Sequence, residues 1–183
     1  VLSLKKNLKQ KKFQIKTICV GNIFIGGTGK TSLSIAISKI VNKKFKTTFI
    51  KKKYTNQLDE KRLLAKYGNV IFEDERIKAL NIAQKNYKMA ILDDGLQQKN
   101  IKYDLKIVCF NSTEAIGNNF ILPAGPLREP LNSVKKCNFV VINGKKDKKF
   151  ENKLLQIHPF IKIYYSKYLP VNHKNLRGKR VLA

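Results

Sequence analysis

The sequence predicts an α/β fold in which helices cover both faces of a doubly wound, mainly parallel sheet. Short apolar runs alternate along the chain with longer stretches in which apolar residues recur every three or four positions. This order is typical of strands joined by crossover helices. The run 89–92 has four apolar residues in succession, which favours a strand buried on both faces. A length of 183 residues suits one such domain.

The expected elements follow from these two periodicities. Strands are expected in the apolar runs at 15–20, 47–50, 70–72, 89–92, 105–110, 139–142 and 161–165. Helices are expected where apolar residues have helical spacing, at 30–42, 58–67, 77–84 and 150–158. The side chains predicted to face the core are Leu33, Ile37, Ile40 and Val41 in the first helix and Ile77, Leu80 and Ala83 in the third.

The segment that links the first strand to the first helix predicts a phosphate-binding loop. Gly26, Gly27 and Gly29 permit positive φ angles and a close approach of a ligand to the backbone. The free N–H groups of such a loop and of the following helix form a site for anions. Lys30 is placed to reach β- and γ-phosphates, and the Thr31 hydroxyl is placed to ligate Mg²⁺.

The spacing of this loop departs from the general pattern G-x-x-x-x-G-K-[ST]. That pattern puts its first glycine at position 24, where this chain has Phe24. Gly21 or the glycine pair at 26 and 27 can open the turn instead. The alternative interpretation is a tight turn that binds nothing.

Two adjacent carboxylates, Asp93 and Asp94, follow the run 89–92. In open α/β sheets ligands bind at the carboxyl ends of strands, and in P-loop proteins an aspartate at this place holds Mg²⁺. A turn or helix cap is the alternative, because Asp-Asp-Gly also suits that role. The phosphate-binding loop upstream favours the metal interpretation.

A third motif, at 117–130, contains three prolines and two glycines. Arg128 and Glu129 lie between prolines and are therefore held in place. A loop this constrained is more often a functional site than a spacer.

Composition leaves the partners open. The net charge of +26 and the pI of about 10.1 favour a polyanion, either nucleic acid or an anionic membrane. Compositional bias is the other interpretation, because lysine supplies 33 of the 38 basic residues and is scattered along the chain. Val1, Leu4 and Leu8 predict a basic amphipathic helix that can lie on an anionic bilayer, with a solvated arm as the alternative. The three cysteines are far apart and predict buried thiols rather than a zinc site.

Together the three motifs resemble those of the tetraacyldisaccharide 4′-kinase family, the lipid A 4′-kinases. That family carries Val-Gly-Asn-x-x-x-Gly-Gly-x-Gly-Lys-Thr, Asp-Asp-Gly-x-Gln-His and Leu-Pro-Ala-Gly-Pro-Leu-Arg-Glu-Pro. The counterparts here stand in the same order, at 20–31, 93–98 and 122–130. The unusual spacing at position 24 is a feature of this family's loop, and the resemblance runs from about residue 12 to the end of the chain.

The resemblance implies a kinase that uses ATP and Mg²⁺. Its acceptor is the 4′-hydroxyl of a tetraacylated glucosamine disaccharide 1-phosphate, and its product is lipid IVA in lipid A biosynthesis. The resemblance also implies a peripheral protein on the cytoplasmic face of the bacterial inner membrane, held there by the basic segment 1–14. We further expect a monomer that binds no nucleic acid.

The resemblance assigns roles to residues by their place in the motifs. The residues matched to phosphate binding are Gly26, Gly27, Thr28, Gly29, Lys30 and Thr31. The residues matched to metal binding are Thr31, Asp93, Asp94 and Glu129. The residues matched to catalysis are Lys30, Asp59, Asp94 and Arg128. Asp59, from a Gly-Asp-Glu-Pro motif whose flanks differ here, is expected to orient the sugar hydroxyl and accept its proton.

Three departures from the family pattern concern substrate positioning and the base. The segment 51–54 reads Lys-Lys-Lys-Tyr in place of Ser-Arg-Gly-Tyr, Gln98 replaces a histidine, and the stretch between 54 and 59 is short. They leave open a paralogue that has lost catalysis. A basic P-loop ATPase module that binds nucleic acid is the other alternative, and it rests on the charge alone.

The expected organisation has three parts. A membrane-surface segment at 1–14 precedes a P-loop kinase lobe at 15–166, and 167–183 begins a second, truncated α/β lobe. We therefore expect a piece of a longer protein with little or no turnover of its own.

Overall fold

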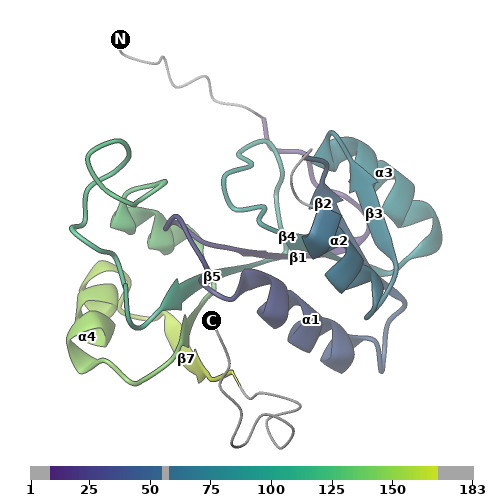
Figure 1. Ribbon diagram of the computed structural model, residues 1–183. Helices are drawn as coiled ribbons and strands as arrows, with labels where there is room; N and C mark the ends of the chain where they lie inside the picture. The colour runs from purple at the N-terminus through teal and green to yellow at the C-terminus, as the bar shows by residue number, and fades with distance from the viewer. Residues whose placement is uncertain (1–8, 55–57, 169–183) are drawn as a thin grey trace, which may run out of the picture.

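A computed structural model describes residues 9–54 and 58–168. Its centre is a seven-stranded sheet in the order β3-β2-β4-β1-β5-β6-β7, and every pair of neighbouring strands is parallel (Figure 1). The strands are β1 Lys16–Gly21, β2 Thr47–Lys52, β3 Val70–Glu73, β4 Met89–Asp93, β5 Leu105–Asn111, β6 Phe139–Asn143 and β7 Lys162–Ser166. The helices are α1 Lys30–Val41, α2 Leu58–Ala65, α3 Arg76–Asn86 and α4 Lys148–Ile157, with a 3-10 helix at Leu131–Lys136.

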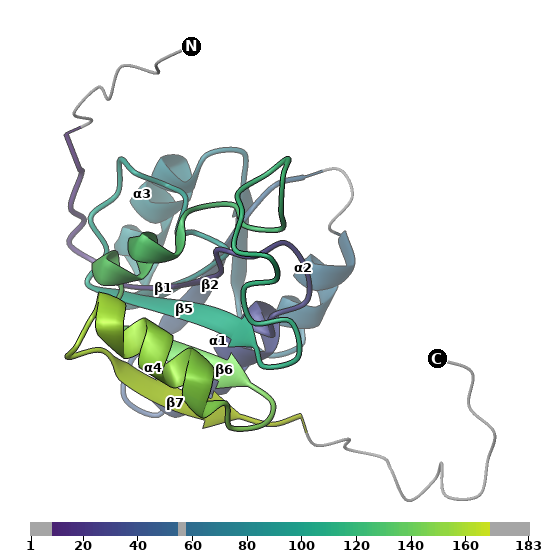
Figure 2. The same ribbon diagram turned by 90° about the vertical axis from the view of Figure 1, so that its left-hand side faces the viewer.

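Helices cover both faces of the sheet, as the predicted fold class requires. On one face, strand side chains pack against α1 and α2 in a cluster that includes Ile18, Val20, Ile35, Leu64 and Ile91. On the other face, one cluster packs against α3 and includes Cys19, Leu80, Ala83 and Leu92. A second cluster on that face packs against α4 and includes Val108, Phe110, Phe150 and Leu154. Figure 2 shows α4 lying along β6 and β7.

The strand order decides where the functional motifs meet. β4 lies between β1 and β2, with Val20 opposite Asp93 and Ile50 opposite Leu92. The carboxyl end of β4 therefore lies beside the loop that leaves β1 and beside the end of β2. Parallel strands place all three ends at one edge of the sheet, where α/β proteins bind ligands.

The loop after β5 returns to this same edge. Its residues 126–128 run beside the phosphate-binding loop, with the Ile25 N–H donating to the Pro126 carbonyl at 2.9 Å and the Arg128 N–H donating to the Ile23 carbonyl at 2.7 Å. A bridge between Phe24 and Leu127 completes the contact. Phe24 is buried in the core that this loop covers, so the side chain that breaks the general loop spacing has a packing role.

The predicted strands and helices are confirmed with small shifts at their ends. On the predicted buried face of α1, Leu33, Ile37 and Val41 pack against the core, but Ile40 does not. Ile40 is 68% exposed, whereas Ser34, Ile35 and Ser38 are the buried residues of this helix. Two small serine side chains thus lie on the face of α1 that covers β4 and β1, whereas Ile40 faces solvent. Hydrophobicity alone does not reveal such a face.

Two further sets of predictions concern the cysteines and the two ends of the chain. The three cysteines are free and buried, as expected, and burial raises the pKa of Cys109 to about 12 and that of Cys137 to about 11. The segment 1–8 and nearly all of 167–183 lie outside the described residues. Among the described helices, none has the length and apolar character needed to cross a bilayer.

We predict that substitutions at Phe110, in the core, and at Ile40, on the surface of α1, differ clearly in their effect on stability. Phe110 is fully buried and meets Phe150 edge to face at 5.0 Å between ring centroids. Phe110→Ala should therefore lower the free energy of unfolding by ~3–5 kcal/mol. Ile40→Ala, the control, should change it by less than ~0.5 kcal/mol because the side chain is exposed. Urea unfolding measures both values, and equal losses would contradict the assignment of the buried face of α1.

Candidate phosphate and metal site

The predicted phosphate-binding residues gather around one hollow. Gly26, Gly27, Thr28, Gly29, Lys30 and Thr31 all line a cavity of about 310 Å³, together with Ser32, Glu60 and Tyr168. Gly26 and Gly29 have φ angles of 119° and 86°, a region that side chains with a Cβ rarely adopt. α1 starts at Lys30, and no side chain caps its first turn. The unpaired N–H groups of that turn and the positive end of the helix dipole are therefore available to an anion.

A buried asparagine of the first motif, to which the sequence assigned no role, holds this loop in shape. Asn22 is fully buried and donates from Nδ2 to the Gly26 carbonyl at 3.4 Å. Its Oδ1 accepts from Arg128 Nη1 at 3.0 Å, and its carbonyl accepts from Gln97 Nε2 at 2.8 Å. All three sequence motifs thus converge on Asn22. Its signal in the sequence is its place in the motif at 20–31, directly after the first strand.

Asp94 brings together cations from two of the motifs. Its Oδ1 accepts from Arg128 Nη1 at 2.9 Å and lies 4.0 Å from Lys30 Nζ. Its backbone has a φ of 60°, and its N–H donates to the Val20 carbonyl at 2.8 Å. Burial alone raises the pKa of this carboxyl, but the Lys30 ammonium and the Arg128 guanidinium outweigh it and hold the pKa of Asp94 below its ordinary value.

Asp93 faces the other side of the site. Its side chain is fully buried, and its Oδ2 accepts from Lys51 Nζ at 2.7 Å and from Thr31 Oγ1 at 3.2 Å. Its Oδ1 is buried and has no hydrogen-bond partner among the described residues. Burial acts to lower the pKa of Lys51, but the charges of Asp93 and Glu60 outweigh it and raise that pKa.

The donor set at Asp93 fits Mg²⁺. A hydroxyl and a carboxylate lie next to each other at the edge of the phosphate hollow, and one carboxylate oxygen still lacks a partner. Mg²⁺ is usually held by one or two carboxylates together with substrate phosphates and water. Among the described residues, no group of three or more His, Cys, Asp or Glu side chains forms a ready-made metal cage.

Two predicted site residues lie apart from this cluster. The Asp59 side chain is 99% exposed and pairs with Arg62 at 3.7 Å along α2. Its neighbour Glu60, rather than Asp59, lines the hollow and pairs with Lys51. For Glu129, no hydrogen bond or ion pair within the described part of the chain joins its carboxylate to the site. The roles assigned to Asp59 and Glu129 therefore remain predictions.

A buried arginine explains one of the departures from the family pattern. Arg76, at the start of α3, donates from Nη2 to the Asp94 carbonyl and from Nη1 to Gln98 Oε1 at 3.5 Å. Gln98 in turn donates to Asn100. These contacts brace the turn after β4 from behind. Gln98 thus belongs to a structural network, and it does not line the phosphate hollow.

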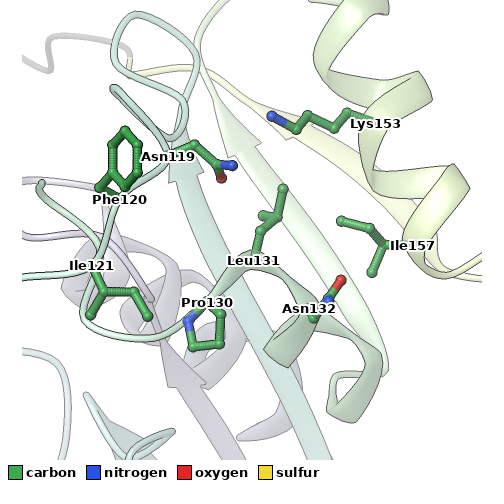
Figure 3. Close-up of a pocket in the computed structure, with 8 residues that line it drawn as sticks. All are labelled: Asn119, Phe120, Ile121, Pro130, Leu131, Asn132, Lys153 and Ile157. Carbon is green, nitrogen blue, oxygen red and sulfur yellow. The ribbon is translucent and has the colours of Figure 1, made fainter.

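A second hollow lies between the loop 117–130, the 3-10 helix and α4 (Figure 3). It has a volume of about 590 Å³ and is lined mainly by apolar groups. Figure 3 shows the loop on one side of it and α4 on the other, with the 3-10 helix between them. The lining residues are Asn119, Phe120, Ile121, Pro130, Leu131, Asn132, Lys153 and Ile157. Phe120, Ile121 and Leu122 are 62%, 43% and 50% exposed.

Comparisons of the sequence with known proteins point to one family. A family model described as tetraacyldisaccharide-1-P 4′-kinase (LpxK) matches residues 2–66 and 51–183. The tetraacyldisaccharide 4′-kinase of Pelagibacter ubique is 47% identical over 94% of this chain and 56% of its own length. The corresponding protein of Porphyromonas gingivalis is 27% identical over 90% of this chain and 55% of its own length. The chain thus spans about half the length of the curated relatives it matches.

Solved structures support the fold. The crystal structure of LpxK from Aquifex aeolicus in complex with ATP superposes with a TM-score of 0.64 at 20% identity, covering 96% of this chain and 77% of that one. The hydrogenase maturation factor HypB of Archaeoglobus fulgidus gives a TM-score of 0.58 at 13% identity, with 84% of this chain and 82% of that chain covered. At these identities the likeness establishes the P-loop α/β fold.

We predict that nucleotide binding depends on Lys30. Lys30→Met should weaken ATP binding at least ~10-fold, because it removes a charge-assisted contact worth ~1.5–3 kcal/mol. Lys43→Met removes an exposed lysine just beyond the same helix and should leave the affinity within ~2-fold. Isothermal titration with ATP measures both, and an unchanged affinity in the Lys30 variant would remove the hollow as the phosphate site.

Proposed function

Because the chain belongs to the tetraacyldisaccharide-1-P 4′-kinase family, we propose that the protein phosphorylates a lipid acceptor with ATP. The γ-phosphate goes to the 4′-hydroxyl of a tetraacylated glucosamine disaccharide 1-phosphate, and the product is lipid IVA. The observation that carries this proposal is the contact of Asp94 with both Lys30 and Arg128. It joins the phosphate loop, the acidic pair and the proline-rich loop at one edge of the sheet.

The residues act mainly by position and charge, as phosphoryl transfer requires. The N–H groups of the loop 26–31 and the Lys30 ammonium hold the β- and γ-phosphates. Arg128, fixed by Asn22 and Asp94, lies where its guanidinium can stabilise charge that develops on the transferred group. Thr31 and Asp93 would hold Mg²⁺, with Asp94 and Glu129 as further candidates. The bound ion would neutralise phosphate charge.

The acceptor hydroxyl needs a group that orients it and takes its proton. Asp59 is the candidate from the family motif, and it lies on α2 one residue before Glu60, which lines the hollow. Its exposed side chain is free to turn toward an acceptor that enters from solvent. In phosphoryl transfer such a carboxylate acts by orienting the hydroxyl and accepting its proton late in the reaction.

The transfer reaction gives the direct test of this proposal. The full-length protein should move labelled γ-phosphate from ATP to a lipid A disaccharide 1-phosphate. Asp94→Asn should lower kcat at least ~100-fold, in line with the loss of one preorganised charge at a transfer site. Glu75→Gln alters an exposed carboxylate that pairs with Lys78 on the solvent side of α3 and should retain activity. If no transfer occurs and binding to DNA or RNA falls steeply with salt, the nucleic-acid alternative holds instead.

We also propose that the protein works on an anionic membrane surface. The net charge of +26 gives a long-range attraction to anionic lipid. The basic segment 1–14, whose first eight residues lie outside the described part, supplies the anchor. Exposed apolar side chains at 120–122, two of which line the second hollow, support this setting, because contiguous exposed apolar groups mark contact surfaces.

Removal of residues 1–8 tests the anchor and leaves every described residue in place. The deletion takes away Lys5, Lys6 and the apolar positions, and should reduce partition onto phosphatidylglycerol vesicles at least ~10-fold, at ~1 kcal/mol per lysine. The control replaces Lys43 and Lys44, an equal charge loss in an exposed turn, by glutamine. Co-sedimentation measures both, and equal losses in the two variants would refute a dedicated anchor.

A further inference from the structure

Lys51 is a buried cation between two carboxylates from different elements. It lies in β2, and its side chain is 3% exposed. Nζ donates to Asp93 Oδ2 at 2.7 Å and forms a close ion pair with Glu60 of α2. Lysine is almost never this buried unless it is paired. The pairing therefore explains why Lys51 points inward.

Each partner of Lys51 belongs to the phosphate site. Asp93 also accepts from Thr31 Oγ1, and Glu60 lines the hollow around the phosphate-binding loop. Lys51 thus connects the end of β4 to the first turn of α2. It lines no part of the hollow itself, so its effect on chemistry runs through its two partners.

In the described part of the chain, one other contact joins the start of α2 to the sheet: the Lys61 ammonium lies over the Phe72 ring of β3, 4.6 Å from its centroid. The helix spans only Leu58–Ala65, a length at which an isolated helix is marginal in water. Leu64 anchors its last turn in the core. The Asp59–Arg62 pair is exposed and lies within the helix, so it contributes little to docking. Among the described residues, the ion pair between Glu60 and Lys51 is the contact that ties the turn bearing Asp59 to a buried charge of the sheet.

We propose that Lys51 is a positioning residue that couples the Asp93 carboxylate to the first turn of α2. It shares Asp93 Oδ2 with Thr31, and this orients the carboxylate and leaves Oδ1 available at the metal site. Through Glu60 it holds the turn that carries Asp59 beside the phosphate hollow. The consequence for catalysis rests on the proposed kinase function, whereas the mechanical coupling does not.

Lys51→Met is not used in the test, because it leaves the Asp93 carboxylate buried and unpaired, which typically costs ~3–5 kcal/mol and compromises folding. The variants chosen instead keep a counter-charge for Asp93. Glu60→Gln breaks the link to α2 alone, and Lys51→Arg preserves both pairings. Asp59→Asn is the matched control for hydrogen exchange. It also removes a carboxylate from the first turn of α2 and so accounts for the helix-dipole contribution.

Amide hydrogen exchange of residues 58–65 in the full-length protein gives a readout that needs no lipid. Glu60→Gln should accelerate exchange at least ~10-fold beyond Asp59→Asn, because a hydrogen bond between charged groups is lost. Lys51→Arg should stay within ~2-fold of the parent. Equal acceleration in Glu60→Gln and Asp59→Asn would overturn the coupling.

Kinetics then separate positioning from nucleotide binding. Glu60→Gln should lower kcat at least ~10-fold and leave the affinity for ATP within ~2-fold, and Lys51→Arg should retain most of the activity. A parallel loss of ATP affinity, or an unaltered kcat, would overturn the positioning role. A parent protein without lipid phosphorylation but with the expected exchange pattern would instead refute the proposed function and leave the coupling intact.

Discussion

The pairing of two adjacent carboxylates with three cations at the end of β4 is the constraint on which the site depends. Asp93 and Asp94 point to different sides and are neutralised by Lys51, Lys30 and Arg128. These cations come from β2, α1 and the loop after β5. Because each carboxylate is largely buried, its charge is tolerable only while its partners stay in place. Three segments far apart in sequence are thereby held at one sheet edge.

The direction of the pKa shift of Asp94 determines how the stability of the fold depends on pH. The pKa of Asp94 lies below its ordinary value in the folded protein because Lys30 and Arg128 favour the carboxylate over its burial. The stabilisation is therefore fully present above the pKa of the unfolded chain, and it is lost as the pH falls through the folded value. The chain has 12 acidic and 38 basic residues, so most basic side chains cannot pair with a carboxylate. Asp93 and Asp94, by contrast, each pair with basic side chains.

Much of the fold was predictable from the sequence because its signals are local. Apolar runs revealed the strands, and the glycines with Lys30 and Thr31 revealed the phosphate loop, since that chemistry depends on neighbouring residues. The strand order was not predictable in this way, because the placement of β4 between β1 and β2 depends on contacts between distant segments. The buried serines of α1 were missed because small polar residues give no hydrophobic signal.

The candidate site shows the same division. The motif residues were found, but Asn22 was given no role within its motif and Arg76 was missed. The role of Lys51 became visible only in three dimensions. Lys51 was noticed in sequence as a departure from a motif. Its partners Asp93 and Glu60 are 42 and 9 residues away along the chain, so no local pattern reveals the ion pairs. Glu60, rather than Asp59, lines the hollow because successive residues on a helix point in different directions.

A direct measurement of the pKa of Asp94 tests this account most closely. Carboxyl ¹³C NMR titration of the protein and of Arg128→Met follows that single group. The account predicts a pKa below ~3.9, the ordinary value for aspartate, in the parent protein and a higher pKa once the guanidinium is removed. A parent value at or above ~3.9, or an equal value in the two proteins, would contradict it.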